Sequence, residues 1–249
     1  MSSPALAGWS AVFRRELASY VATPLALVFT VIFLIATATF TFYIGSFFEA
    51  GRAELTAFFR FHPWLFLFLG PAMAMRLWAE ERRSGTLELL LTLPVSTAGA
   101  VLGKFLAAWA VTCVALALTF PLWLTVNLLG NPDNGVIIAS YLGSALMMGG
   151  YLAIGGCLSA ATRNQVIAFI TAALVCFIFL LAGFPFVLDF VRGVLPQPLV
   201  EAIASLSFFT HFEAISKGVI DLRDLIYFGA LIGFWLAATA VVLDLKKAD

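Results

Sequence analysis

The chain has 249 residues, of which 62% are hydrophobic and 11% charged, and its formal net charge is zero. A soluble domain usually carries about 25% charged residues, so this composition excludes a water-soluble fold and indicates a protein that has hydrocarbon as its solvent. The charge balance gives no indication of a nucleic-acid partner. The cysteines stand singly in apolar runs, and we interpret them as packing residues rather than disulfide or metal sites. They are Cys113, Cys157 and Cys176.

Six apolar stretches are long enough to cross a membrane, since a helical span needs about 20 residues. In chain order they are Leu17–Phe48, Phe61–Ala79, Phe105–Leu129, Val136–Ala161, Val166–Leu188 and Leu225–Leu243. We expect helices because an open strand leaves backbone groups unpaired in lipid. The sequence therefore predicts an all-α polytopic membrane protein with six transmembrane helices, organised as a single transmembrane domain over residues 1–249.

The distribution of lysine and arginine predicts how these spans are oriented. With both termini placed in the cytoplasm, nine basic residues lie inside and five lie outside, as the positive-inside rule requires. The inner set is Arg14, Arg15, Arg76, Arg82, Arg83, Lys104, Arg163, Lys246 and Lys247; the outer set is Arg52, Arg60, Arg192, Lys217 and Arg223. We therefore predict that both termini are cytoplasmic.

Two segments between the spans have a distinctive pattern. The inner loop Glu80–Gly103 begins with charges and continues into Thr86–Leu93, which we expect to form a short amphipathic helix. The outer segment Asp189–Asp224 contains the apolar stretch Leu199–Phe209, which is too short to span and predicts short helices at the membrane interface. Asp221 is the expected N-cap of the last span.

Motifs for chemistry are missing from the sequence. It contains no zinc-protease, serine-hydrolase or Walker A motif, so we do not expect an enzyme or a cofactor bound by this chain. Gly103-Lys104 looks like the end of a phosphate loop, but the residue after the lysine is phenylalanine rather than serine or threonine. We interpret His62 and His211 as amphipathic residues at the surface rather than as a metal pair.

Small residues recur every fourth position in the fourth span, where they would let another helix approach closely. They are Ala145, Gly149, Ala153, Cys157 and Ala161. This stripe has two interpretations, a contact between subunits or packing within one subunit, and we favour packing within one subunit.

The inner loop resembles that of the ABC-2 type transporter permeases. The resemblance rests on the run from Glu80 to Leu90, which reads EERRSGTLELL, and on the Pro94-Val95-Ser96 that follows. Further stretches resemble the gliding-motility-type branch of these permeases. They are Phe13–Leu17, Leu102–Phe105, Leu129–Pro132, Asn164–Phe169 and Ile215–Leu225.

This resemblance implies the membrane subunit of an ATP-driven transporter in the bacterial cytoplasmic (inner) membrane. It forms half of the translocation unit, pairs as a homodimer, and couples to a separate ATPase that binds ATP and magnesium. An auxiliary subunit with a domain outside the cell is a further expected partner. The residues expected to couple to the ATPase are Glu80, Glu81, Arg82, Arg83, Gly85, Thr86, Glu88 and Leu90, with a second contact at Arg14, Arg15 and Glu16.

One alternative function remains open at this point. The chain would then be a membrane scaffold that transmits the motion of an ATPase to a mechanical or regulatory partner without moving a solute. Transport of a substrate by the reconstituted complex separates the two functions.

Overall fold

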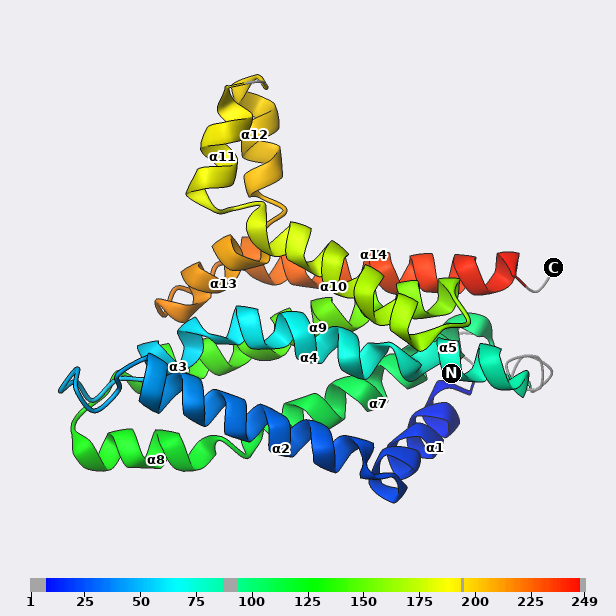
Figure 1. Cartoon of the computed structure of the whole chain (residues 1–249), viewed down its shortest axis with the longest axis horizontal. Coiled ribbons are helices and arrows are strands. Elements are labelled where there is room, and N and C mark those ends of the chain that lie inside the picture. Colours follow the sequence, from blue (N-terminus) through cyan, green and yellow to red (C-terminus); the bar gives the residue numbers. More distant parts are fainter. Residues whose placement is uncertain (1–7, 87–93, 194, 247–249) are drawn as a thin grey trace.

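The structure is a computed structural model that describes residues 8–86, 94–193 and 195–246. Within these residues every regular element is a helix. The helices run mostly along one direction and form an elongated bundle, with the first and last described residues at the same end (Figure 1). In chain order they are α1 (Trp9–Ala22), α2 (Pro24–Thr39), the π-helical turn η2 (Phe40–Ile44), α3 (Thr56–Arg60), α4 (His62–Ala74), α5 (Arg76–Ser84), α7 (Thr97–Ala117), α8 (Phe120–Leu129), α9 (Asn134–Ala161), α10 (Gln165–Leu181), α11 (Pro185–Arg192), α12 (Gln197–Ala204), α13 (Phe208–Ser216) and α14 (Leu222–Leu245).

Helix α9 is the centre of the bundle and contacts α4, α5, α7, α10, α13 and α14. Its small residues make these contacts short. A Cβ on Gly149 would lie 3.0 Å from the Cδ1 of Ile232 in α14, and a Cβ on Gly155 would lie 2.5 Å from the Cβ of Ala74 in α4. At Gly149, the predicted small-residue stripe therefore packs against helices of the same chain, as the interpretation that we favoured requires.

Four helical stretches are long and apolar enough to cross a membrane. They are Ala26–Ile44, Thr97–Leu129, Asn134–Ala161 and Leu222–Leu245. A fifth is the pair α10 and α11, if the two helices count as one span bent by 77°. The described chain is thus a helical protein with four or five candidate spans of this kind.

Several predicted spans have different boundaries in the structure. The first was wrong over Leu17–Ala22, because these residues belong to α1, which ends where Thr23 precedes Pro24 and takes an extended conformation. The third begins earlier, at Thr97, because the side chain of Ser96 caps the helix by accepting a hydrogen bond from the backbone N–H of Gly99.

The fifth predicted span was wrong at its end, because α10 ends at Leu181. At Gly183 a Cβ would lie 2.6 Å from the Oγ of Ser207, so only glycine lets the start of α13 come this close. Pro185 then opens α11 in a new direction. Helices α11 and α12 pack against each other and form a hairpin that projects away from the bundle (Figure 1).

The second predicted span, Phe61–Ala79, is divided between α4 and α5. Pro71 cannot donate a backbone hydrogen bond. One turn later, the hydroxyl of Ser159 on α9 donates to the carbonyl of Met75 at 2.8 Å and accepts from the N–H groups of Trp78 and Ala79 at 3.1 and 3.0 Å. A side chain from another helix therefore takes the place of part of the helical hydrogen-bond ladder and fixes the break.

The segments between the predicted spans agree only partly with expectation. The charged start of the inner loop is helical, because α5 continues to Ser84, whereas the expected helix Thr86–Leu93 lies outside the described residues apart from Thr86. The outer segment does form short helices, α12 and α13, and Asp221 caps α14 by accepting a hydrogen bond from the N–H of Arg223 at 3.0 Å.

Candidate functional site

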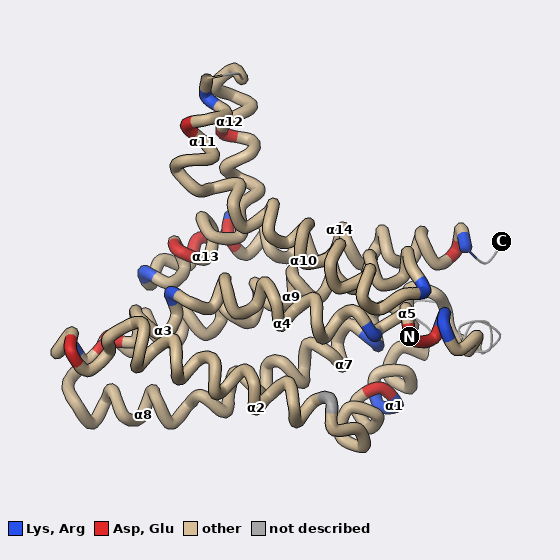
Figure 2. Tube along the Cα trace, viewed as in Figure 1, with Lys and Arg blue, Asp and Glu red and all other residues tan. Residues whose placement is uncertain are grey.

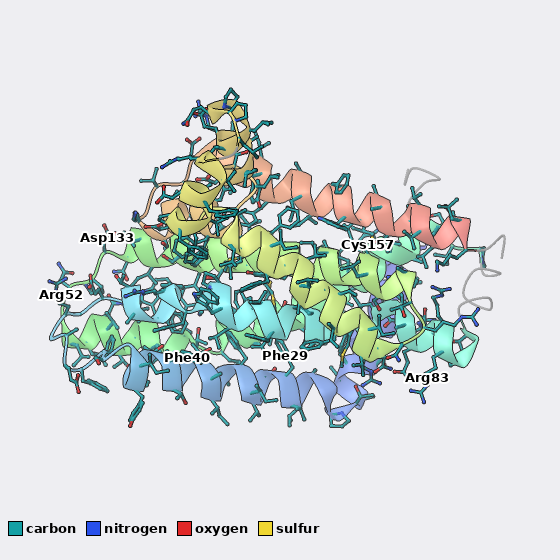
Figure 3. The ribbon with its side chains drawn as sticks, turned by 45° about the horizontal axis from the view of Figure 1, so that its top comes forward. Phe29, Phe40, Arg52, Arg83, Asp133 and Cys157 are labelled. Atoms are coloured by element: carbon teal, nitrogen blue, oxygen red, sulfur yellow. The ribbon has the colours of Figure 1, made fainter. Side chains whose placement is uncertain are left out.

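Among the described residues, the charged ones lie at the two ends of the bundle and on the α11–α12 hairpin, and the middle of the bundle has almost none (Figure 2). We call the end that holds α1, α5, the start of α7 and the end of α14 the basic end, because arginine and lysine outnumber acidic residues there. Arg83 lies at the basic end, and Arg52 and Asp133 lie at the opposite end (Figure 3). The coupling residues predicted from the sequence and lying within the described residues all belong to the basic end.

Helix α1 rests directly on α7 at Gly103. A Cβ at this position would lie 2.6 Å from the carbonyl oxygen of Trp9 and 3.1 Å from the backbone N of Phe13. The missing side chain therefore brings the main chain of α1 against α7. This contact holds α1 against α7, although α1 is a helix of its own that precedes the first candidate span.

Lys104, the next residue, is the centre of an ion network. Its side chain is 4% exposed, and its Nζ lies 3.1 Å from the Oε1 of Glu16 on α1 and 2.9 Å from the Oε1 of Glu81 on α5. The same ammonium group lies 5.1 Å from the centre of the Trp78 ring. Lys104 on α7 therefore binds α1 and α5 at once.

Arg15 completes the network at the surface. Its guanidinium lies 2.6 Å from Glu16 and 3.2 Å from Glu81, so two basic and two acidic side chains balance one another. Burial disfavours the charged form of Glu16, but Lys104 and Arg15 outweigh that effect and hold the pKa of its carboxyl below the usual value. The carboxylate of Glu16 is therefore held in its charged form between the three helices.

Two further contacts join α5 to its other neighbours. Glu80 pairs with Arg76 at 3.3 Å and accepts a hydrogen bond from the side chain of Gln165 at the start of α10. The guanidinium of Arg82 donates to the carbonyl of Ala160 in α9 at 2.8 Å. Movement of α5 would therefore pull on α1, α7, α9 and α10 together.

The structure separates the predicted coupling residues into two groups. Glu16, Glu80, Glu81, Arg15 and Arg82 bond within the chain, as described above. Arg14, Arg83, Gly85 and Thr86 are exposed at the basic end, and Glu88 and Leu90 lie outside the described residues.

Sequence reasoning missed Lys104 as a site residue, because it was treated as one of the inner basic residues and as a poor match to the lysine of a phosphate loop. A sharper signal was available in its surroundings. A single lysine between Gly103 and Phe105, at the start of a long apolar run, must find a counter-charge when its helix packs.

The two histidines also differ from expectation. His62 is fully buried rather than at the surface, and its Nδ1 lies 2.8 Å from the hydroxyl of Ser144 on α9. His211 is only partly exposed, with its Nδ1 2.6 Å from a carboxylate oxygen of Asp224. The surface interpretation was therefore wrong for His62, because residues of α2, α3 and α4 surround it with aromatic rings.

The opposite end of the bundle contains a pocket of about 580 Å³ between α3, α4, α9 and α13. Phe59, Phe209 and Phe212 give it apolar walls, while Arg60 and Asp133 contribute charge. It can offer both apolar and polar contacts to a molecule at this end.

A bundle of apolar helices with charged ends defines a multi-pass membrane protein. The chain matches the family described as ABC-2 family transporter protein over residues 10–245, and it belongs to that family. Family membership implies pairing with an ABC ATPase. A search of curated proteins found no match to the chain.

Proposed function

We propose that this chain is the permease subunit of an ATP-driven transporter and that its basic end receives the motion of a separate ATPase. The observation that carries the proposal is the Lys104 network, which joins α1, α5 and α7 at the end where the predicted coupling residues lie. The sequence lacks a Walker A motif, so the energy must come from another subunit. ATP and magnesium would be bound by that subunit.

The proposed assembly is a homodimer of this chain with two ATPase subunits at the basic end, in the bacterial cytoplasmic membrane. An auxiliary subunit would bind at the opposite end, where the pocket beside α13 offers mixed polar and apolar contacts. The gliding-motility-type branch remains our proposal for the position of the chain within its family. Transport of a substrate by the reconstituted complex is expected, whereas a scaffold would hydrolyse ATP without transport.

We propose six membrane crossings, with α4 and α5 forming the additional one. The described chain starts and finishes at the same end of the bundle, which requires an even number of crossings (Figure 1). Helices α4 and α5 follow each other with one residue between them, and both pack against α9. Helices α11 to α13 would then lie at the outer interface.

Cysteine labelling in sealed cells tests this topology. In a variant whose three native cysteines are replaced, cysteines at Asp133 and Glu201 should react with a membrane-impermeant reagent. Cysteines at Thr86 and Lys246 should react only after the membrane is opened. All four positions are exposed in the structure, so a difference reports the side of the membrane. Reaction at Thr86 in sealed cells contradicts the proposed orientation.

The proposed docking element is the turn at Gly85 and Thr86 together with the segment up to Leu90, with Arg14 as a neighbouring contact. Gly85 ends α5 with a φ of 72°, and a Cβ there would have no neighbour within 4 Å. A β-branched side chain strongly disfavours this left-handed conformation. A substitution here changes the direction of the chain that follows without disturbing the packed helices.

We expect Gly85→Val to lower ATPase co-purification at least severalfold while the permease still folds and inserts. Gly51→Val is the matched control, because Gly51 also has a positive φ, 60°, and also has no neighbour within 4 Å of an added Cβ. Gly51 is far from the basic end in sequence and structure, so its variant should keep the ATPase. Full ATPase binding by the Gly85 variant argues against docking at this turn.

A further inference from the structure

A small pocket at the basic end has two arginines in its wall. It has a volume of about 370 Å³ and lies between the last turn of α5 and the start of α10. Its walls are Arg83, Arg163, Asn164, Gln165 and Val166. Figure 3 shows Arg83 at the edge of the bundle, where its side chain is exposed.

The positive charge of this pocket is not balanced by the part of the chain that the structure describes. Neither Arg83 nor Arg163 forms an ion pair or a side-chain hydrogen bond with a described residue. The nearby carboxylate of Glu80 already bonds Arg76 and Gln165.

Two arginines that face one pocket without a counter-charge favour an anion, and a phosphate oxygen pair fits the guanidinium geometry. The main chain of α10 does not supply the donors. Asn164 already accepts hydrogen bonds from the N–H groups of Val166 and Ile167 at 2.9 and 3.4 Å. Recognition of an anion therefore falls to the two guanidinium groups.

The apolar surface beside the pocket indicates which anion this is. Val166 belongs to the pocket wall and also begins an exposed apolar stripe along α10, in which residues follow at every fourth position. The stripe is Val166, Ile170, Leu174 and Ile178. One face of α10 thus carries exposed apolar side chains from the two arginines toward the middle of the bundle. A phospholipid needs such a surface for its acyl chains beside the site that binds its phosphate.

We propose that this pocket binds the phosphate of an anionic phospholipid, whose acyl chains lie along the Val166–Ile178 face of α10. Arg83 and Arg163 hold the headgroup, and the lipid belongs to the leaflet at the basic end. Basic pockets between membrane helices on the cytoplasmic side are a known way to bind anionic headgroups. With Arg83 assigned to the lipid, the ATPase docking element described above rests on Gly85, Thr86 and the residues that follow.

The experiment compares phosphatidylglycerol with phosphatidylcholine of the same acyl chains, using the full chain purified in detergent without an ATPase. Native mass spectrometry counts bound lipid. We expect the wild-type chain to bind more phosphatidylglycerol than phosphatidylcholine. In the double variant Arg83→Gln/Arg163→Gln, the ratio of the two bound lipids should fall about tenfold. The variant Arg83→Lys/Arg163→Lys keeps the charge but not the paired donors, and it should retain an intermediate preference.

The matched control is Arg52→Gln/Arg223→Gln, which removes two exposed arginines at the opposite end and should keep the full preference. An unchanged preference in the Arg83/Arg163 glutamine variant overturns the proposal. Glycerol phosphate that competes as well as the whole lipid also overturns it, because the site then binds a free anion. If that variant binds lipid normally but no longer retains the ATPase, the arginines are a protein contact instead.

Discussion

Replacing Lys104 with methionine is expected to destabilise the basic end strongly, because it leaves Glu16 and Glu81 without their buried partner. Both carboxylates are largely buried, with side-chain exposures of 15% and 16%. Removing one partner of a buried ion pair typically costs about 3–5 kcal/mol, because the remaining charge stays buried. Arg15 still contacts both carboxylates, so we expect about 3 kcal/mol, at the lower end of this range.

Thermal unfolding of the purified chain measures this effect, and hydrogen exchange of the α1 amides locates it. The control is Lys217→Met, which breaks an exposed pair with Glu213 and should cost less than about 1 kcal/mol. Adding Glu16→Gln and Glu81→Gln to the Lys104 variant removes the stranded charges and should restore part of the stability. Equal unfolding temperatures for the Lys104 and Lys217 variants contradict the assigned network.

The same substitution tests whether the network transmits motion. If α1, α5 and α7 move as one unit, the triple variant should fold and bind the ATPase, but its ATP turnover should no longer depend on substrate. Coupled turnover at the wild-type level in the triple variant shows that the network stabilises the chain without a part in coupling.

Replacing Gly103 with leucine is expected to displace α1 from α7 without changing any charge. The new side chain would meet the main chain of Trp9 and Phe13, which cannot rotate away. Overpacking of this kind typically costs about 1–3 kcal/mol. Because the whole of α1 moves, the ion pair between Glu16 and Lys104 should break as well.

Gly233→Leu provides the matched control, because Gly233 is also inside a long helix and an added Cβ there has no neighbour within 4 Å. That variant should be neutral or slightly more stable, since glycine is the weaker helix former by about 1 kcal/mol. Hydrogen exchange should rise across Trp9–Ala22 in the Gly103 variant alone. Unchanged protection of α1 in that variant would mean that α1 is not held by this contact.

Much of the architecture follows from local features of the sequence. The apolar runs predict helices, and helix starts at α9 and α14 coincide with Asp133 and Asp221, whose side chains cap them. Threonines within the spans bond their own helix; for example, Thr37 donates to the carbonyl of Phe33 at 2.6 Å. These features depend on residues within about one helical turn, so they can be predicted from the sequence without knowing which helices are neighbours.

Breaks within the apolar runs were harder to predict, because they combine a local weakness with a contact from elsewhere. Pro71 and Pro185 are visible in the sequence, but the break after α4 also needs the hydroxyl of Ser159, 84 residues from Met75. The bend at Gly183 likewise depends on Ser207. A proline or glycine permits a bend, and the packing partner decides where it forms.

The sequence alone determined that this protein lies in a membrane, that its segments are helical, and that its charges concentrate at span ends, because these properties follow from composition and short-range spacing. Only the tertiary structure decided that Lys104 pairs with Glu16 and Glu81, that His62 is buried, and that Arg83 and Arg163 face one pocket. Each of these depends on which helix faces meet. Apolar helices in lipid have many similar ways to pack, and the choice among them rests on small residues and single polar contacts spread over the whole chain.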